Sequence, residues 1–221
     1  MSRDRLRMLL VAGAFLLSLA ASPFLPGDLP ASWGIPAAVA RWAGRGVTAL
    51  FLPLAAGAIC AIFGRLAAVD PLRTNYDRFR GTYDLVLDAA VVLILGLHAT
   101  LLAVLLAGTR PWLGYALPLL VGLLIIVVGN ALPRIRPNAA LGIRTPWTLA
   151  SERAWATTHR IGGYVVVGFG LFIVVATFVV RRGLGALLGG GAAATVLLLV
   201  LVSYLAWRAQ TAEKETAAGP R

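Results

Sequence analysis

The sequence predicts an all-α fold, a polytopic bundle of six transmembrane helices in one membrane domain over residues 1–221. Hydrophobic residues make up 59% of the chain and charged residues only 13%, whereas an average soluble domain carries roughly 25% charged residues. The apolar residues also come in long runs rather than at amphipathic spacing. Lipid accepts such runs because a helix satisfies its backbone hydrogen bonds internally.

Six runs approach the length of about 20 residues that a helix needs to cross a bilayer. They cover residues 6–25, 47–64, 85–107, 112–132, 164–180 and 184–207. The first run begins among three arginines, Arg3, Arg5 and Arg7, and Ser22 and Pro23 lie near its end, so a cleaved signal peptide is the alternative to a retained helix. We expect a retained helix. Cleavage would leave five spans in the same orientation.

The distribution of basic residues predicts the orientation of the chain. Fifteen of the twenty Lys and Arg residues lie in the N-terminus, the second and fourth connections, and the C-terminal tail. We therefore expect a multi-pass membrane protein with both ends in the cytoplasm. This topological role also explains the net charge of +11, so no direct binding to nucleic acid is expected.

The end of the chain carries two further features. The tail over 211–221 is polar, and we expect it to be disordered. Gly185 and Gly189 form a G-x-x-x-G pair in the last run, for which close helix packing is the ordinary explanation and a dimer interface the alternative.

Asp88 and His98 are polar candidates within the third predicted span, where ionisable residues are candidates for function. Asp84 precedes Asp88 by one helical turn. We expect both carboxylates to pair with Arg78 or Arg80 at the membrane edge. For His98 we expect a neutral ring that is hydrogen-bonded to a neighbouring helix, with a proton-transfer or ligand role as the alternative.

Catalytic and metal-binding patterns are weak. His98, His159 and Cys60 are the histidines and the cysteine of the chain, and none of them has a partner at metal-ligand spacing. We expect no metal site and no other cofactor. Ser151 and Glu152 with His159 supply the residue types of a hydrolase, but no nucleophile elbow surrounds them. We expect that the protein is not an enzyme.

The most informative stretch is the fourth connection with its flanks, residues 129–163. It contains two tryptophans, three prolines and five arginines. Thr145 and Pro146 suit the N-cap and the first position of a helix. We predict a short helix over 146–160 along the inner membrane surface, with Trp147 and Trp155 at the headgroup level. An interfacial anchor that sets helix geometry is the simpler interpretation of this stretch.

The same stretch closely resembles the signature of the SdpI family of bacterial membrane proteins. That signature is a G-N run, basic residues, N-x-x-x-G-I-R-T-P-W-T-L and W-x-x-T-H-x-x-G-G. Many relatives also carry a P-x-H-F element between the first two spans, but residues 29–34 contain no histidine. The matching positions that we take as ligand- or partner-binding candidates are Asn130, Arg134, Arg136, Asn138, Gly142, Arg144, Thr145, Pro146, Trp147, Trp155, Thr158 and His159.

The resemblance implies an immunity protein that protects a toxin-producing cell from its own secreted peptide toxin and sequesters a cytoplasmic repressor at the membrane. The expected partners are membrane lipids, an extracellular peptide toxin and a cytoplasmic repressor protein. Arg144 is the foremost candidate, because a guanidinium can clamp backbone carbonyls, a carboxylate or a lipid phosphate. The alternative is a small transporter or lipid-binding protein of unknown substrate, which Asp88 and His98 would serve.

Overall fold

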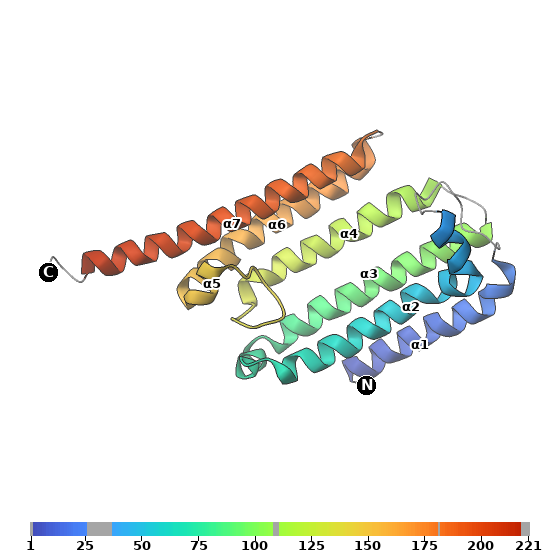
Figure 1. Cartoon of the computed structure of the whole chain (residues 1–221), viewed down its shortest axis with the longest axis horizontal. Helices are drawn as coiled ribbons and strands as arrows, with labels where there is room; N and C mark the ends of the chain where they lie inside the picture. The colour runs from blue at the N-terminus through green and yellow to red at the C-terminus, as the bar shows by residue number, and fades with distance from the viewer. Residues whose placement is uncertain (1, 26–36, 108–110, 181, 218–221) are drawn as a thin grey trace. The chain divides into compact units, whose positions relative to one another are not determined.

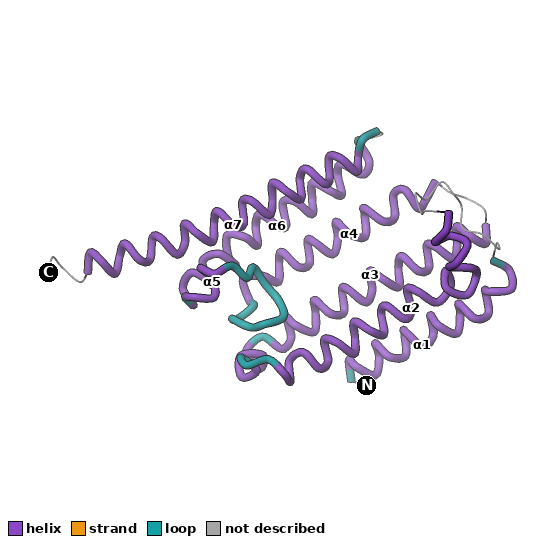
Figure 2. The backbone as a smooth tube through the Cα atoms, in the orientation of Figure 1, coloured by secondary structure: helices purple, strands orange, loops and turns teal. Residues whose placement is uncertain are grey.

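The computed structural model describes residues 2–25, 37–107, 111–180 and 182–217, and every element in these ranges is helical (Figures 1 and 2). The elements are α1 (Arg3–Ala21), η1 (Ser22–Phe24), α2 (Ala37–Val69), η3 (Arg73–Arg78), α3 (Arg80–Ala107), α4 (Pro111–Ala131), η4 (Leu132–Arg134), α5 (Pro146–Ala150), α6 (Glu152–Val179) and α7 (Leu184–Ala217).

Six of these helices are long and apolar enough to cross a membrane, which confirms the predicted fold class. The apolar helical segments run over Arg3–Phe24, Ala49–Val69, Arg80–Ala107, Gly114–Arg134, Glu152–Val179 and Leu184–Glu213. Each predicted span falls largely within one of them. The P-x-H-F position of the relatives, residues 29–34 here, lies outside the described residues.

The chain divides into two compact units. The first consists of Met1–Gly64 and Leu87–Leu120, and the second of Arg65–Val86 and Val121–Arg221. In the first unit, Ala21 and Leu25 at the end of α1 form a buried cluster with Ala49 of α2 and Leu102 of α3. Small side chains in this cluster allow the helix backbones to approach closely.

In the second unit, α4 and α6 cross through two reciprocal pairs of glycines. A Cβ on Gly129 would lie 3.0 Å from the carbonyl oxygen of Gly163, and a Cβ on Gly163 would lie 2.9 Å from that of Gly129. Gly122 and Gly170 face each other in the same way, at 3.1 and 2.8 Å. The pairing order is antiparallel, and side chains larger than hydrogen would push the two backbones apart.

The packing of α7 corrects the interpretation of its glycines. Gly185 and Gly189 have no atom within 4 Å of their Cβ positions in the described part of the chain, so intramolecular helix packing does not explain that pair. Gly191 makes the close contact instead, since its Cβ position lies 2.9 Å from the ring of Phe169 and 3.3 Å from that of Phe172 on α6.

Two local predictions are wrong. The expected surface helix over 146–160 is interrupted at Ser151, which is extended and whose hydroxyl caps α6 by accepting from the N–H of Ala154. Residues 152–160 are therefore the first turns of a spanning helix. The tail was expected to be disordered from residue 211, but α7 continues to Ala217, and residues 218–221 lie outside the described residues.

Candidate functional site

The signature residues form a folded segment between α4 and α6, drawn as the loop and short helix beside the label α5 in Figures 1 and 2. Pro133 is the second residue of the 3-10 turn η4, which follows α4 because proline disfavours continuation of the α-helix. The chain from Ile135 to Thr145 has no regular secondary structure. Several of its backbone polar groups are instead satisfied by side chains from the signature and from the connection between α2 and α3.

Asn138 organises the first half of the segment. Its side chain is fully buried. Its Oδ1 accepts from the backbone N–H groups of Ala140 and Leu141, both at 2.7 Å. Its Nδ2 donates to the carbonyl oxygens of Arg136 at 2.7 Å and Leu141 at 3.0 Å. This position requires a short side chain that both donates and accepts, which explains an amide here.

His159 and Trp155 close the segment against the start of α6. The backbone N–H of Ile143 donates to His159 Nε2 at 3.0 Å. The other ring nitrogen, Nδ1, lies 2.8 Å from the carbonyl oxygen of Trp155. Nε2 must accept the proton of the Ile143 N–H, and Nδ1 must donate a proton to the Trp155 carbonyl oxygen. The His159 ring is therefore the neutral tautomer that carries its proton on Nδ1. The two rings also stack, with their centroids 4.1 Å apart.

Trp155 and Gly142 complete this contact. Trp155 is 1% exposed, and its indole Nε1 donates to the carbonyl oxygen of Ile135 at 2.9 Å. The expectation that the Trp155 ring is partly exposed at the headgroup level, with its N–H in water, is therefore wrong. Gly142 has φ +116°, and a Cβ there would collide with His159 Nε2 and the Trp155 ring. Glycine is required at position 142 both by the backbone conformation and by space.

The helix α5 is fixed by Thr145, Pro146 and Thr148, which form a capping box with proline at the first turn. The hydroxyl of Thr148 also donates to the carbonyl oxygen of Ile143 at 2.8 Å. The ring of Trp147 meets that of Tyr204 on α7 edge-on, with centroids 5.3 Å apart. These contacts confirm the N-cap that the sequence predicted and connect the signature to the last helix.

Further contacts join the start of α6 to the end of α7. The Ser151 hydroxyl donates to Gln210 Oε1 at 2.5 Å, and Arg153 forms an ion pair of 2.6 Å with Glu213. The helical extension of α7 beyond the predicted span supplies both partners.

Three residues of the connection between α2 and α3 hold the signature segment in place, and the sequence reasoning missed them. Asp70 is 4% exposed, and its Oδ2 accepts from the Ala139 N–H and the Tyr76 hydroxyl, both at 2.6 Å. Asn75 Nδ2 donates to the carbonyl oxygen of Pro137 at 2.8 Å. No local sequence pattern predicts these contacts. A carboxylate directly before proline, at the end of an apolar run, was the available signal.

The Asp70 carboxylate is ionised in this setting. Burial alone would raise its pKa, but hydrogen bonds from Tyr76, Ala139 and Leu72, with the charge of Arg144, hold the pKa below its usual value. Burial and the neighbouring Asp70 carboxylate raise the pKa of Tyr76, so its hydroxyl stays protonated and remains a donor. Arg144 therefore lies close enough to stabilise Asp70 electrostatically.

The basic signature residues point their charge outward. Arg134, Arg136 and Arg144 are exposed, as is Asn130, whose carbonyl oxygen accepts from Arg134 Nη2 at 3.1 Å. Within the described residues the Arg144 guanidinium makes no hydrogen bond or ion pair. The structure thus brings the signature together as a buried polar framework with arginines on its surface.

Thr158 differs from the other buried signature residues. It is fully buried on α6, and its hydroxyl has no hydrogen-bond partner among the described residues. A threonine on a helix can donate to a carbonyl one turn earlier, as Thr177 does to Ile173 at 2.7 Å. Among the described residues, the hydroxyl of Thr158 makes neither this bond nor any other hydrogen bond to the framework.

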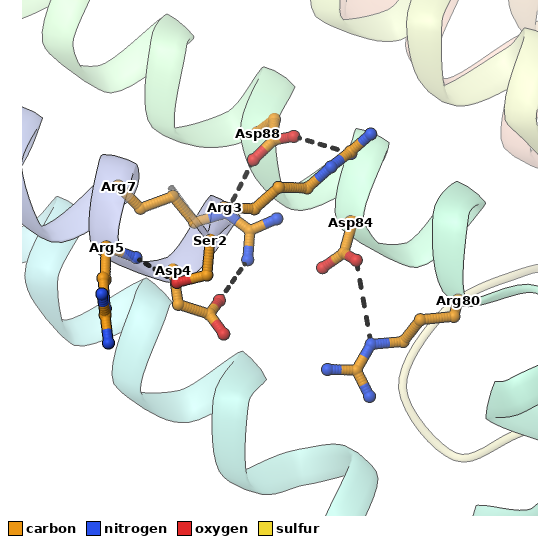
Figure 3. A network of polar contacts seen from close by, with 8 residues as sticks. All are labelled: Ser2, Arg3, Asp4, Arg5, Arg7, Arg80, Asp84 and Asp88. Atoms are coloured by element: carbon orange, nitrogen blue, oxygen red, sulfur yellow. Dashed lines mark hydrogen bonds and ion pairs between the residues drawn. The ribbon is translucent and has the colours of Figure 1, made fainter.

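The carboxylates of α3 have the partners shown in Figure 3. Asp84 pairs with Arg80 at 3.7 Å, as expected. Asp88 does not pair with Arg78 or Arg80. It binds Arg7 at 2.6 Å and Arg3 at 3.1 Å, both from α1 (Figure 3). The helix-surface argument failed for Asp88 because α1 packs on that face of α3.

His98 has the expected contact with a neighbouring helix. It is 1% exposed, and its Nε2 lies 3.0 Å from the hydroxyl of Ser18 on α1. Ser18 donates its single proton to the carbonyl oxygen of Ala14 at 2.9 Å, so the histidine nitrogen is the donor in the pair. In the described part of the chain, no three His, Cys, Asp or Glu residues gather as metal ligands.

Together these features define a multi-pass helical membrane protein whose signature segment is folded against the start of its fifth spanning helix. The sequence model of the SdpI/YfhL protein family matches residues 134–206, from η4 into α7. The protein named Immunity protein SdpI from Bacillus subtilis (strain 168) is 25% identical over 180 residues, which are 80% of this chain and 83% of that protein. These matches confirm the resemblance to the SdpI family. No solved structure matches the chain.

Proposed function

We propose that the chain is an immunity protein that protects its cell against a secreted peptide toxin. The observation that carries the proposal is the similarity to Immunity protein SdpI, which extends over 83% of that protein rather than over the signature alone. The folded signature supports it, because a passive connection would not need the buried contacts of Asn138, Trp155 and His159. Buried polar contacts of this kind hold the segment in one conformation, which indicates a surface of fixed shape.

The proposed mechanism is recognition rather than catalysis. Both ring nitrogens of His159 are occupied by backbone partners, and the Ser151 proton is directed to Gln210. These residues therefore lack the free base and activated nucleophile that a hydrolase needs. Recognition by binding is consistent with the exposed guanidinium groups at the edge of the folded segment.

We place the signature segment and both chain ends on the cytoplasmic side, because that arrangement puts fifteen of the twenty basic residues there. The opposite ends of the helices would then meet the extracellular toxin. The exposed Arg144 would offer a cytoplasmic repressor protein a charged contact. The orientation can be tested by fusing to the C-terminus a reporter protein that is active in the cytoplasm but inactive in the periplasm. Absence of reporter activity in intact cells would contradict the cytoplasmic placement.

A protection assay tests the proposed function. Toxin-sensitive bacteria would express the protein at verified membrane abundance and would be challenged with the secreted peptide toxin that SdpI-family immunity proteins resist. We expect survival at toxin concentrations that kill cells carrying an unrelated membrane protein of similar size. Equal killing of both strains would contradict the immunity proposal for that toxin.

A small transporter or lipid-binding protein is the second candidate. His98 favours it, because its Nδ1 is buried without a hydrogen-bond partner among the described residues and buried polar groups in spans mark transport pathways in many proteins. Asp88 supports it less, since its charge is paired with Arg3 and Arg7. Solute flux in reconstituted vesicles, abolished by His98→Ala, would favour this candidate over the first.

A further inference from the structure

The connection between α2 and α3 and the signature segment together present a group of arginines around one buried carboxylate. The hydrogen bonds of Asp70 and Asn75 to the backbone of residues 137–139 join the two segments. We call this junction the Asp70 knot. Its members are Asp70, Asn75, Tyr76, Pro137 and Ala139.

Three exposed arginines border the Asp70 knot. The backbone N–H of Arg73 donates to the carbonyl oxygen of Asp70 at 3.0 Å, which places this residue next to the knot in η3. Arg136 directly precedes Pro137, and the carbonyl oxygen of Arg136 accepts a hydrogen bond from Asn138 Nδ2 at 2.7 Å. Arg144 lies within electrostatic range of Asp70. All three side chains are exposed.

The Asp70 carboxylate does not neutralise these arginines through direct contact. Its Oδ1 accepts from the Leu72 N–H at 2.7 Å, and its Oδ2 is used by Tyr76 and Ala139. Within the described residues, Arg73, Arg136 and Arg144 make no ion pair. Asp77 is the carboxylate of η3 and is exposed, so the three guanidinium groups outnumber this one free carboxylate beside them.

The position of this surface places it at the lipid headgroups. Arg73 lies just beyond the end of α2 at Val69, and Arg136 lies just beyond the end of η4, which closes the apolar segment Gly114–Arg134. Val69 and Leu72 beside them are 74% and 42% exposed. Exposed apolar side chains interleaved with arginines are typical of a surface that meets the boundary between acyl chains and headgroups.

We propose that Arg73, Arg136 and Arg144 around the Asp70 knot form a binding site for the phosphate of an anionic phospholipid. Guanidinium groups bind phosphate oxygens through paired, charge-assisted hydrogen bonds. The knot fixes the backbone beneath two of the arginines, so less conformational entropy is lost on binding than from a flexible basic loop. This site goes beyond the proposed immunity function and does not depend on it.

The test is a titration of the purified full-length protein in a neutral detergent with short-chain phosphatidylglycerol or phosphatidylcholine. Intrinsic tryptophan fluorescence reports binding. We expect tighter binding of phosphatidylglycerol, weakened by added salt. Arg73→Gln and Arg136→Gln should each weaken it about fivefold, since a basic residue near an anionic surface contributes about that factor.

Arg182→Gln is the matched control, because Arg182 is exposed in the connection between α6 and α7, beyond the other end of α6. It removes one charge and should leave the phosphatidylglycerol affinity unchanged. Equal affinities for the two lipids, or equal losses in Arg136→Gln and Arg182→Gln, would overturn the proposal. Binding of an acidic peptide with no lipid preference would also overturn it and would assign the surface to a protein partner.

Discussion

Asp70 Oδ2 accepts a hydrogen bond from the backbone N–H of Ala139 at 2.6 Å, across 69 residues of sequence. This contact joins the short connection after α2 to the signature segment after α4. It makes the shape of the signature depend on a residue that lies outside the signature. The Tyr76 hydroxyl, which donates to the same oxygen at 2.6 Å, strengthens that dependence.

The Asp70 contact predicts a pH dependence of stability. Because the folded pKa of Asp70 is lowered, its contribution is fully present above the unfolded value of about 3.9 and is lost as pH falls through the folded pKa. Thermal unfolding in detergent between about pH 7 and about pH 3 should show an acid limb that Asp70→Asn flattens. An identical acid limb in the variant would contradict the role of Asp70.

The backbone at Gly142 predicts a loss of stability in Gly142→Ala. The residue has φ +116°, and its Cβ would collide with the His159 ring. The conformational strain alone costs about 1–3 kcal/mol, so thermal unfolding should shift to lower temperature. Gly81→Ala is the control, since no atom lies within 4 Å of that Cβ position. Equal stabilities of the two variants would contradict the described geometry.

The crossing of α4 and α6 predicts different effects for two glycines of the same helix. A Cβ on Gly163 would lie 2.9 Å from the backbone oxygen of Gly129, whereas Gly168 faces open space. Gly163→Ala should destabilise the protein by about 1–3 kcal/mol through overpacking. Gly168→Ala should be neutral or slightly stabilising. Denaturation in mild detergent measures both, and a tolerated alanine at position 163 would rule out this crossing.

The unpartnered hydroxyl of Thr158 predicts that Thr158→Val keeps or raises stability. Burying a hydroxyl without a partner costs about 1–3 kcal/mol, and valine has the same shape. If the valine variant loses toxin protection while remaining stable, Thr158 contacts a ligand in the working protein. A marked loss of stability would show that the hydroxyl has a partner in the folded chain.

The sequence predicted the elements that depend on local physics. Long apolar runs gave the six spans, and Thr145 with Pro146 gave the start of α5. The contacts of Asp70 and Asp88 were not predictable in this way, because their partners come from distant parts of the chain and one sequence carries no pairing information. The buried state of Trp155 was missed for the same reason, since Ile135 supplies the acceptor that water would have supplied.

Arg144→Gln tests most directly whether the folded signature takes part in the proposed function, because the guanidinium of Arg144 is exposed on the signature surface. Cells carrying this variant and cells carrying Arg65→Gln, which removes an exposed arginine near the end of α2 outside the signature, would be compared in the protection assay at equal membrane abundance. The account predicts that the Arg65 variant protects like the wild type and that the Arg144 variant loses protection. Full protection by the Arg144 variant would contradict a functional role for the signature surface and leave it as a structural element.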